Sequence, residues 1–381
     1  MELPFNTDTC QNCHIKNGRG YLPCTTVGPV GSMLLRHATT LAVGSKPTKP
    51  AGEVPQSFRG DQSQDTHFPG NHAEGRVRLK YTEIPVTFSD HSQINVRKPG
   101  LNIELLGYSP MHTDMRFSTR IAPSMIGVEL LEAISEHDIR ANAVKQSSTS
   151  RLIHDKVNEV WDQTKGKVLI GRFGWKADQP DLNQKNTHVF TEEMGRTNTL
   201  STRNDCTQQQ TVCREAPRSG TLQVSEQILA NLLYYTRNLA VPRRRDVDSP
   251  QVLIGKALFH QAGCASCHVP SYVTGDASEP RLSRQKIFPY TDLLLHNMGD
   301  ELADGRSEYL ADGNHWRTPP LWGIGQASQV SGPTHLLHDG RARTLMEAIV
   351  WHGGEARGSR NEVLMFDQAQ RDALVRFLNS L

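Results

Sequence analysis

The sequence has no long run of apolar residues. No stretch approaches the roughly 18 consecutive apolar positions that cross a bilayer, so a membrane span is not expected. It also has little net charge, because 42 Lys and Arg residues nearly balance 40 Asp and Glu residues. A general nucleic-acid-binding surface is therefore not expected, and we interpret the basic run at residues 243–245 as a solvated linker or a docking point for an acidic partner protein. With 381 residues the chain has room for two or three soluble domains.

Cysteine is scarce as well, with seven residues in the chain, yet four of them fall into two copies of one motif, Cys-x-x-Cys-His. The first copy is Cys10, Cys13 and His14, and the second is Cys264, Cys267 and His268. This spacing is the attachment signature of c-type haem: the two thiols form thioethers with the haem vinyl groups, and the histidine binds the iron. Random placement would give two copies with a probability on the order of one in a hundred thousand. The sequence therefore predicts two haem c groups.

A zinc site and a dithiol redox pair are the alternatives to haem. A zinc ribbon normally brings its second cysteine pair within ~15–20 residues, whereas these two pairs are separated by most of the chain. Neither alternative explains why a histidine directly follows both pairs. Haem is therefore the favoured interpretation, with His14 and His268 as the proximal iron ligands.

The sequence also lacks an export signal, although haem is attached covalently outside the cytoplasm. Residues 1–9 lead directly into the first motif and contain neither an apolar core nor a helix that could wall a haem. We therefore expect the first residue to be internal to a longer protein that is periplasmic or otherwise exported. The first haem region is then expected to be cut short at its start.

The three remaining cysteines agree with an oxidising compartment. Cys206 and Cys213 flank a short polar stretch that suits a disulfide loop. Such a loop would contribute roughly 2.5 kcal/mol in the chain-entropy model, and two unpaired thiols are the alternative. Cys24 has no evident partner and is expected to be a free thiol.

Hydrophobic periodicity predicts mostly helices. Helical spacing of apolar residues occurs at residues 126–139, 223–239, 249–263 and 367–381. Period-two alternation with β-branched and aromatic residues predicts short strands within residues 75–107. The expected fold is mainly α with a small β-region, arranged as two cytochrome c-like haem domains. These domains are residues 1–245, with a β insertion, and residues 249–381.

The ligand on the other face of each iron is harder to predict. The candidates are Met111, His112, Met115, Met125, His296, Met298, His335, His338 and His352. His352 is distinguished by its position, because the helix that Thr344 and Glu347 would begin as a capping box carries His352 on its apolar face. Such a histidine is an iron ligand, a structural core residue or a cation favoured by the helix dipole.

As a set, the motifs resemble those of the bacterial di-haem oxidoreductase family, whose members are often described as thiol oxidoreductases. This family is related to the di-haem cytochrome c peroxidases and the MauG-type enzymes. The matching stretches are residues 5–20, 130–134, 171–177, the pair Cys206 and Cys213, 255–270, 293–299, 317–323, 337–342 and 351–356. The resemblance implies two haem c groups with electron transfer between them. It does not imply thiol chemistry here, because a catalytic dithiol would use the cysteines that bind haem.

The resemblance also implies roles for single residues. In the related peroxidases the sixth ligand of the C-terminal haem comes from the helix after the His-Asp-Gly segment, and the corresponding residue here is His352. Bis-His ligation would give a lower reduction potential than His/Met ligation. An aromatic residue that lies between the haems in that group corresponds to Trp175, for which a packed core side chain is the alternative.

Two functions of different classes remain. The first is a redox enzyme in which electrons enter at the C-terminal haem and the N-terminal haem reacts with peroxide or another small oxidant. Glu132 or His137 could then supply the acid/base group beside the iron, although both also suit a helix surface. The second is an electron carrier with two six-coordinate haems and no substrate site. In both, a small redox protein is the expected electron donor or acceptor.

Overall fold

The structure, a computed structural model, describes residues 5–22, 33–39, 62–63, 72–107, 115–149, 156–202, 206, 210–215, 221–277, 279–333 and 335–381. Of the described residues, 36% are helical and 21% lie in strands, which are distributed over several small sheets. The prediction of a mainly α fold made of two cytochrome c-like domains was therefore wrong. Most of the strands that it missed have only two to four residues, too few to show a period-two pattern in the sequence.

Two sheets carry most of the β-structure in the N-terminal half. β1 (Met33–Thr39) lies between β2 (Gln62–Ser63) and β5 (Met115–Ile121) in an antiparallel sheet. β3 (Arg76–Thr87) and β4 (Gln93–Glu104) form a hairpin with 12 residues in each strand. Strands were predicted in this region, but shorter ones. A two-stranded hairpin has an outer edge on each strand where proline is tolerated, so Pro85 and Pro99 do not interrupt it.

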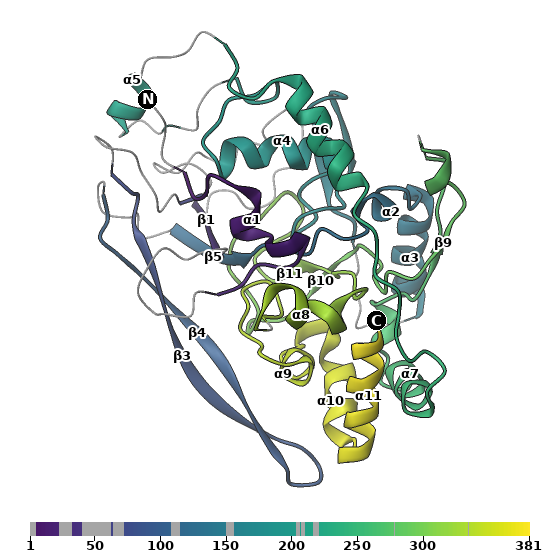
Figure 1. The fold of residues 1–381 in the computed structure, drawn as a ribbon. Helices are drawn as coiled ribbons and strands as arrows, with labels where there is room; N and C mark the ends of the chain where they lie inside the picture. The colour runs from purple at the N-terminus through teal and green to yellow at the C-terminus, as the bar shows by residue number, and fades with distance from the viewer. Residues whose placement is uncertain are drawn as a thin grey trace.

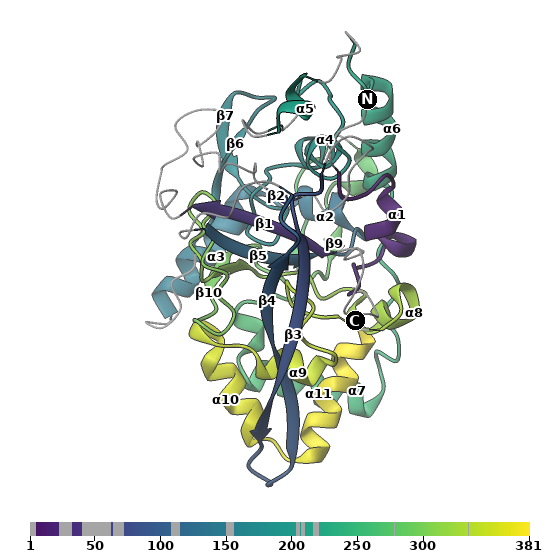
Figure 2. The same cartoon turned by 90° about the vertical axis from the view of Figure 1, so that its left-hand side faces the viewer.

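The β3–β4 hairpin runs along the C-terminal helices, as Figures 1 and 2 show from two sides. At its turn the Ser89 N–H donates to the Leu364 carbonyl oxygen at 3.0 Å. Next to it, Arg371 forms an ion pair with Asp90 at 2.7 Å. The hairpin therefore joins the N-terminal half of the chain to the helices of the C-terminal half.

The helices of the N-terminal half vary widely in length. They are α1 (Cys10–Cys13), η1 (Ile15–Asn17), α2 (Val128–Glu132), α3 (Glu136–Thr149), α4 (Leu182–Glu192), α5 (Thr211–Glu215) and α6 (Glu226–Arg237), with the small hairpin β6 (Glu159–Asp162) and β7 (Lys167–Ile170) between α3 and α4. The single helix predicted at residues 126–139 is two helices, because the Ser135 hydroxyl accepts a hydrogen bond from the Asp138 N–H and begins α3. The helix predicted at residues 223–239 is confirmed as α6, with Ser225 as its N-cap. The longest described helix, α3, has 14 residues, and no described helix is long and apolar enough to span a bilayer.

The C-terminal half is built around two helices that pack along each other. Its elements are α7 (Pro250–Gln261), η3 (Cys264–Ser266), β8 (Tyr272–Val273), η4 (Pro280–Leu282), β9 (Lys286–Ile287), β10 (Leu295–Asn297), β11 (His315–Arg317), η5 (Ile324–Gln326), α8 (Ala327–Ser331), α9 (Leu345–Val350), η6 (Gly354–Ala356), α10 (Arg357–Met365) and α11 (Gln368–Ser380). Leu258 and Phe377 belong to the core between α7 and α11. Gly255 permits the close approach, since a Cβ atom there would lie 1.9 Å from the Ala373 carbonyl oxygen. Both helices were predicted, and both predictions are confirmed.

Candidate functional site

A cavity of about 600 Å³ lies in the C-terminal half, and the second Cys-x-x-Cys-His motif lines it. Cys264 and Cys267 enter it from η3 and its C-cap, and His268 follows them. His352, two positions after the end of α9, lines the same cavity. Many of the other lining residues are apolar, among them Phe259, Leu302, Leu321, Ile324, Leu345, Ile349 and Leu374. A cavity of this size and polarity suits a flat, largely apolar ligand.

Local sequence signals position both histidines. Gly263 has a φ of +76°, the left-handed conformation that ends a helix, so the motif begins directly after α7. On the other side, the Thr344 hydroxyl caps α9 by accepting a hydrogen bond from the Glu347 N–H at 3.1 Å. The Glu347 carboxylate binds Arg343 rather than completing the predicted capping box.

The three predicted ligand histidines are held in the same way. Each has its Nδ1 atom near a backbone carbonyl oxygen: His268 with Tyr290 (2.9 Å), His352 with Ala348 (2.7 Å) and His14 with Gly18 (3.3 Å). A carbonyl oxygen can only accept a hydrogen bond, so we assign the proton to Nδ1 and the lone pair to Nε2. Metal-binding histidines are normally oriented by such a bond to the second nitrogen.

Burial shifts the titration of the motif residues. It lowers the pKa of His268 and of His14 to about 4, and it also lowers the pKa of His352. It raises the pKa of Cys264 to about 12 and raises that of Cys10. At neutral pH the histidines are therefore neutral, as a metal ligand must be, and these two cysteines are thiols. Reactive dithiol sites instead hold a cysteine of lowered pKa, so these shifts do not favour a dithiol redox pair.

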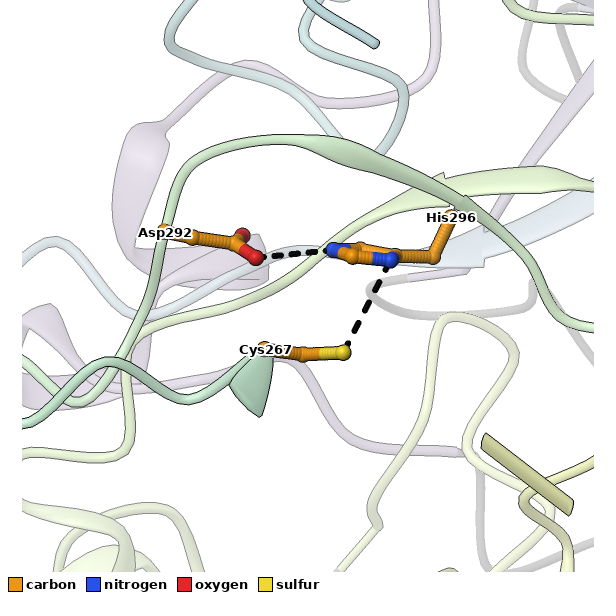
Figure 3. A group of neighbouring side chains, drawn as sticks. All are labelled: Cys267, Asp292 and His296. Atoms are coloured by element: carbon orange, nitrogen blue, oxygen red, sulfur yellow. Dashed lines mark hydrogen bonds and ion pairs between the residues drawn. The ribbon is translucent and has the colours of Figure 1, made fainter. Parts of the chain in front are cut away.

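His296 lies between two carboxylates beside the motif. Its Nε2 atom is 2.8 Å from Asp292 Oδ2, and its Nδ1 atom is 3.0 Å from Glu355 Oε2 and 3.6 Å from Cys267 Sγ. Figure 3 shows the imidazole of His296, from β10, between Asp292 and Cys267. Because carboxylates accept hydrogen bonds, this imidazole can donate from both nitrogens. The group is also compatible with a metal ion, since one ligand atom each from Cys267, Asp292 and His296 lie within 4.8 Å of one another.

Aromatic side chains form part of the cavity wall. The ring of His338 stacks on that of Trp316 with centroids 3.7 Å apart, and it meets Trp175 edge-on at 6.4 Å. All three residues line the cavity. Trp175 is held in place because its Nε1–H donates to the Ile121 carbonyl oxygen at 2.8 Å. The structure therefore brings Trp175 to the cavity of the C-terminal motif.

The first motif is built on a much shorter element. Cys10 and Cys13 are the ends of α1, a helix of four residues capped by Thr9. Cys13 is buried and His14 is half-buried. Neither cysteine nor His14 lines the 600 Å³ cavity. The chain that follows comes close to α8, since a Cβ atom on Gly18 would lie 2.2 Å from Ser331 Oγ.

The two predicted acid/base residues, Glu132 and His137, lie away from the cavity. The carboxylate of Glu132 accepts hydrogen bonds from the Leu182 N–H and from Arg237, both at 2.9 Å, so it ties α2 to α4 and α6. His137 is exposed and contacts Asp138. Of the candidates for a sixth ligand, four line the cavity, namely His296, Met298, His338 and His352. Met111 and His112 lie outside the described residues.

The predicted disulfide is confirmed, with the Cα atoms of Cys206 and Cys213 5.8 Å apart. None of the four cysteines of the two motifs forms a disulfide in the structure, which leaves their sulfur atoms for attachment of a haem. Cys24 lies outside the described residues.

The charged residues of the cavity were missed by sequence reasoning. Five charged residues from three distant segments line it, namely Arg19, Arg317, Glu355, Arg357 and Arg360. The sequence offered one signal for Glu355, which follows His352 by three positions. In the fold, Glu355 lies beside His296, which also contacts Asp292. Nothing local connects Arg19 with the second motif.

The motif, the cavity and the oriented histidines together define a haem-binding redox protein. The family model described as "Di-haem oxidoreductase, putative peroxidase" matches residues 57–381, and the chain belongs to this family. The resemblance found in the sequence is thus confirmed. The matched region contains the second Cys-x-x-Cys-His motif but not the first.

Two further comparisons add little. No curated protein matches the chain. A solved structure of hydrazine synthase from Kuenenia stuttgartiensis, pressurised with xenon, matches 42% of this chain and 57% of that chain, at 21% identity and a TM-score of 0.28. A likeness at this TM-score carries no information about the fold or function of the present chain.

Proposed function

We propose that the protein carries two covalently bound haem c groups and passes electrons between them, with peroxidase-like chemistry at the N-terminal one. Membership of the family supports haem cofactors and redox chemistry in general. The observation that carries the finer proposal is the cavity in which Cys264, Cys267 and His268 meet His352.

The described residues fit a haem in this cavity. Cys264 and Cys267, which form no disulfide, supply the sulfur atoms for the thioethers, and His268 and His352 supply neutral imidazoles whose Nε2 atoms are available. The apolar lining suits the macrocycle and keeps water from its faces. When bound, haem supplies one-electron chemistry at its iron. Two imidazole ligands from this chain would set a lower reduction potential than a His/Met pair.

A second haem is proposed at Cys10, Cys13 and His14. Cys10 and Cys13 form no disulfide, and this and the orientation of His14 support the second haem. Arg19, five positions after His14, lines the C-terminal cavity, so at most roughly 17 Å of extended backbone separates the two sites along the chain. This short link supports electron transfer between the sites. Trp175, which also lines the cavity, is proposed to lie between the two haems, and a packed core residue is the alternative.

The alternative function is an electron carrier without a substrate site, and spectroscopy separates the two. The protein would be matured in a host that attaches haem c, and its ferric form examined by electron paramagnetic resonance before and after peroxide. A high-spin signal beside a low-spin one, with the high-spin signal lost on adding peroxide, supports the peroxidase-like function. Two low-spin signals that peroxide leaves unchanged would overturn it and favour the carrier.

Glu132 stays a prediction as the acid/base group for peroxide. Its present contacts with Arg237 and Leu182 are structural. If it acts as an acid/base group, Glu132→Gln should slow the peroxide reaction about 10²–10⁴-fold while the haem content stays the same. A rate equal to that of the wild type would remove Glu132 from the mechanism.

A second candidate function is binding of a divalent metal by Cys267, Asp292 and His296, which the short distances among their ligand atoms favour. It is incompatible with haem at the second motif, because Cys267 cannot be both a thioether and a thiolate ligand. A haem stain after denaturing electrophoresis decides between them, since covalently bound haem stays on the band. A band without stain, together with one equivalent of zinc by elemental analysis, would favour the metal site.

We further propose that the protein works outside the cytoplasm, in the periplasm or another exported location, with a small redox protein as donor or acceptor. The disulfide between Cys206 and Cys213 supports an oxidising compartment. Cell fractionation followed by haem staining tests the location. Haem-loaded protein found only in the cytoplasmic fraction would overturn it.

A further inference from the structure

Arg19 is a half-buried residue whose charge has no counterpart among the described residues. Its Nη2 atom donates to the Leu337 carbonyl oxygen at 3.1 Å, and its guanidinium carbon lies 5.5 Å from the centroid of the Trp175 ring. Its Nε atom is buried and has no hydrogen-bond partner. Burial lowers its pKa to about 10, and no described carboxylate offsets this shift. The guanidinium therefore stays charged at neutral pH while one of its donors is unused.

Two buried cations near this wall, Arg120 and Lys176, are paired with carboxylates. Arg120 lies 2.8 Å from Glu308, and Lys176 lies 3.0 Å from Asp304. Such pairing is expected, because an uncompensated buried charge costs several kcal/mol. Arg19 differs from these residues in that it lines the 600 Å³ cavity. The cavity is therefore where its counter-charge is expected.

A second arginine marks the same part of the cavity. The backbone N–H of Arg317 donates to the Trp175 carbonyl oxygen, and its side-chain Nε–H donates to the Gly174 carbonyl oxygen, both at 2.9 Å. Arg317 is buried, lines the cavity and forms no ion pair with a described carboxylate. Arg19 thus lies against the ring of Trp175, and Arg317 is hydrogen-bonded to the backbone of Trp175.

The chemistry of haem supplies the missing anions. A haem has two anionic groups, its propionates, which lie on a different edge of the ring from the vinyl groups that bond to cysteine. We infer that Arg19 binds a propionate carboxylate of the haem attached to Cys264 and Cys267, an inference that rests on the proposed function. A guanidinium is well suited to this task, because it can form two parallel hydrogen bonds to one carboxylate.

This contact would make the two haem sites interdependent. Arg19 belongs to the segment of the first motif, five positions after His14, yet it lines the cavity of the second motif, where it would bind the propionate. Reduction adds an electron to the haem, and a nearby positive charge stabilises the reduced form. Arg19 therefore raises the midpoint potential of the C-terminal haem and keeps the propionate ionised.

Potentiometric titration of the haem-loaded protein tests the inference, with Arg19→Gln, Arg19→Lys and the control Lys16→Gln. Lys16 lies in the same segment and is exposed, so its replacement reports the loss of a nearby charge without loss of a contact. The C-terminal haem is identified as the one whose midpoint moves in His352→Met. In Arg19→Gln this midpoint should fall and become dependent on pH between about pH 6 and 8, because a buried propionate without a partner has a raised pKa. Arg19→Lys should shift it less, and Lys16→Gln should leave it unchanged.

An Arg19→Gln protein with two haems and a C-terminal midpoint equal to the wild type at every pH would overturn the inference and leave the proposed function intact. If Arg19→Gln does not mature, Arg19→Lys is decisive through the propionate bending band in resonance Raman spectra. A changed band frequency supports the contact and an unchanged one overturns it. A wild-type protein without covalent haem would overturn both proposals.

Discussion

The two Cys-x-x-Cys-His motifs have the same five-residue pattern and very different surroundings. The second follows a twelve-residue helix, opens into a cavity of about 600 Å³ and meets a second oriented histidine, His352. The first lies on a four-residue helix, and none of its three motif residues lines that cavity. The comparison teaches that the motif supplies attachment and one ligand, whereas the rest of a haem site is supplied by distant segments.

Removing each cysteine pair should produce the largest effects and test the comparison directly. Cys10→Ala with Cys13→Ala, and Cys264→Ala with Cys267→Ala, should each lower the covalent haem content from two to one in a pyridine haemochrome assay. The second pair should lower the melting temperature more, because it leaves the apolar cavity without its ligand. Equal melting temperatures for the two double variants would contradict the difference drawn between the sites.

Replacing the second histidine of the C-terminal cavity should change one haem only. His352→Met should raise the midpoint potential of the C-terminal haem, because Met ligation favours the reduced iron, and should leave the other midpoint in place. His338→Gln is the matched control, since His338 lines the same cavity without being the proposed ligand. If His338→Gln changes the ligation spectrum and His352→Met does not, the assignment of the sixth ligand is wrong.

Lowering the pH should reduce the free energy of unfolding, because the buried His338 resists protonation in the folded chain. Burial lowers the pKa of His338 to about 4 in the folded chain, from an ordinary value of 6.5. Below pH 6.5 the unfolded chain takes up a proton that the folded chain refuses, so stability falls as the pH drops from 6.5 to 4, by up to about 3 kcal/mol. Urea unfolding at several pH values should show a steeper loss in the wild type than in His338→Gln. Parallel curves would mean that His338 titrates normally.

The helix caps beside the two histidines offer the smallest effect and a matched pair. Thr344→Ala removes the cap of α9 and should cost about 1 kcal/mol of unfolding free energy. Thr9→Ala removes the longer, exposed bond at the start of α1, 3.4 Å to the Gln11 N–H, and should cost only a few tenths of that. Thermal denaturation of both variants compares them. A larger loss in Thr9→Ala would show that the first site is the more rigidly held one.

The sequence was sufficient for the parts of the site that depend on local signals. Both motifs, the N-caps Ser225 and Thr344 and the disulfide of Cys206 with Cys213 each rest on residues a few positions apart, and the structure contains these caps and this disulfide. The convergence of His352 with the second motif followed from the resemblance together with the apolar spacing that predicted a helix up to His352, although α9 ends at Val350 in the structure.

The overall fold and the charged part of the cavity could not be predicted, for physical reasons. Strands of two to four residues leave no alternation to detect, so the fold was wrongly expected to be mainly α. The length of β3 and β4 depends on their pairing with each other over 12 residues, which no local pattern in either strand shows. Pro85 is tolerated in β3 because it lies in a strand with an outer edge. Arg19 reaches the cavity only because the segment after the first motif packs against residues near Leu337, a contact between distant parts of the chain.

Mass spectrometry of peptides from the matured, haem-loaded protein tests the central claim most directly. If Cys264 and Cys267 hold a haem in the cavity that His268 and His352 share, the peptide that contains both cysteines carries the mass of one haem and neither thiol can be alkylated. The peptide with Cys10 and Cys13 should carry a second haem. A peptide with Cys264 and Cys267 that is unmodified and fully alkylated would contradict the account.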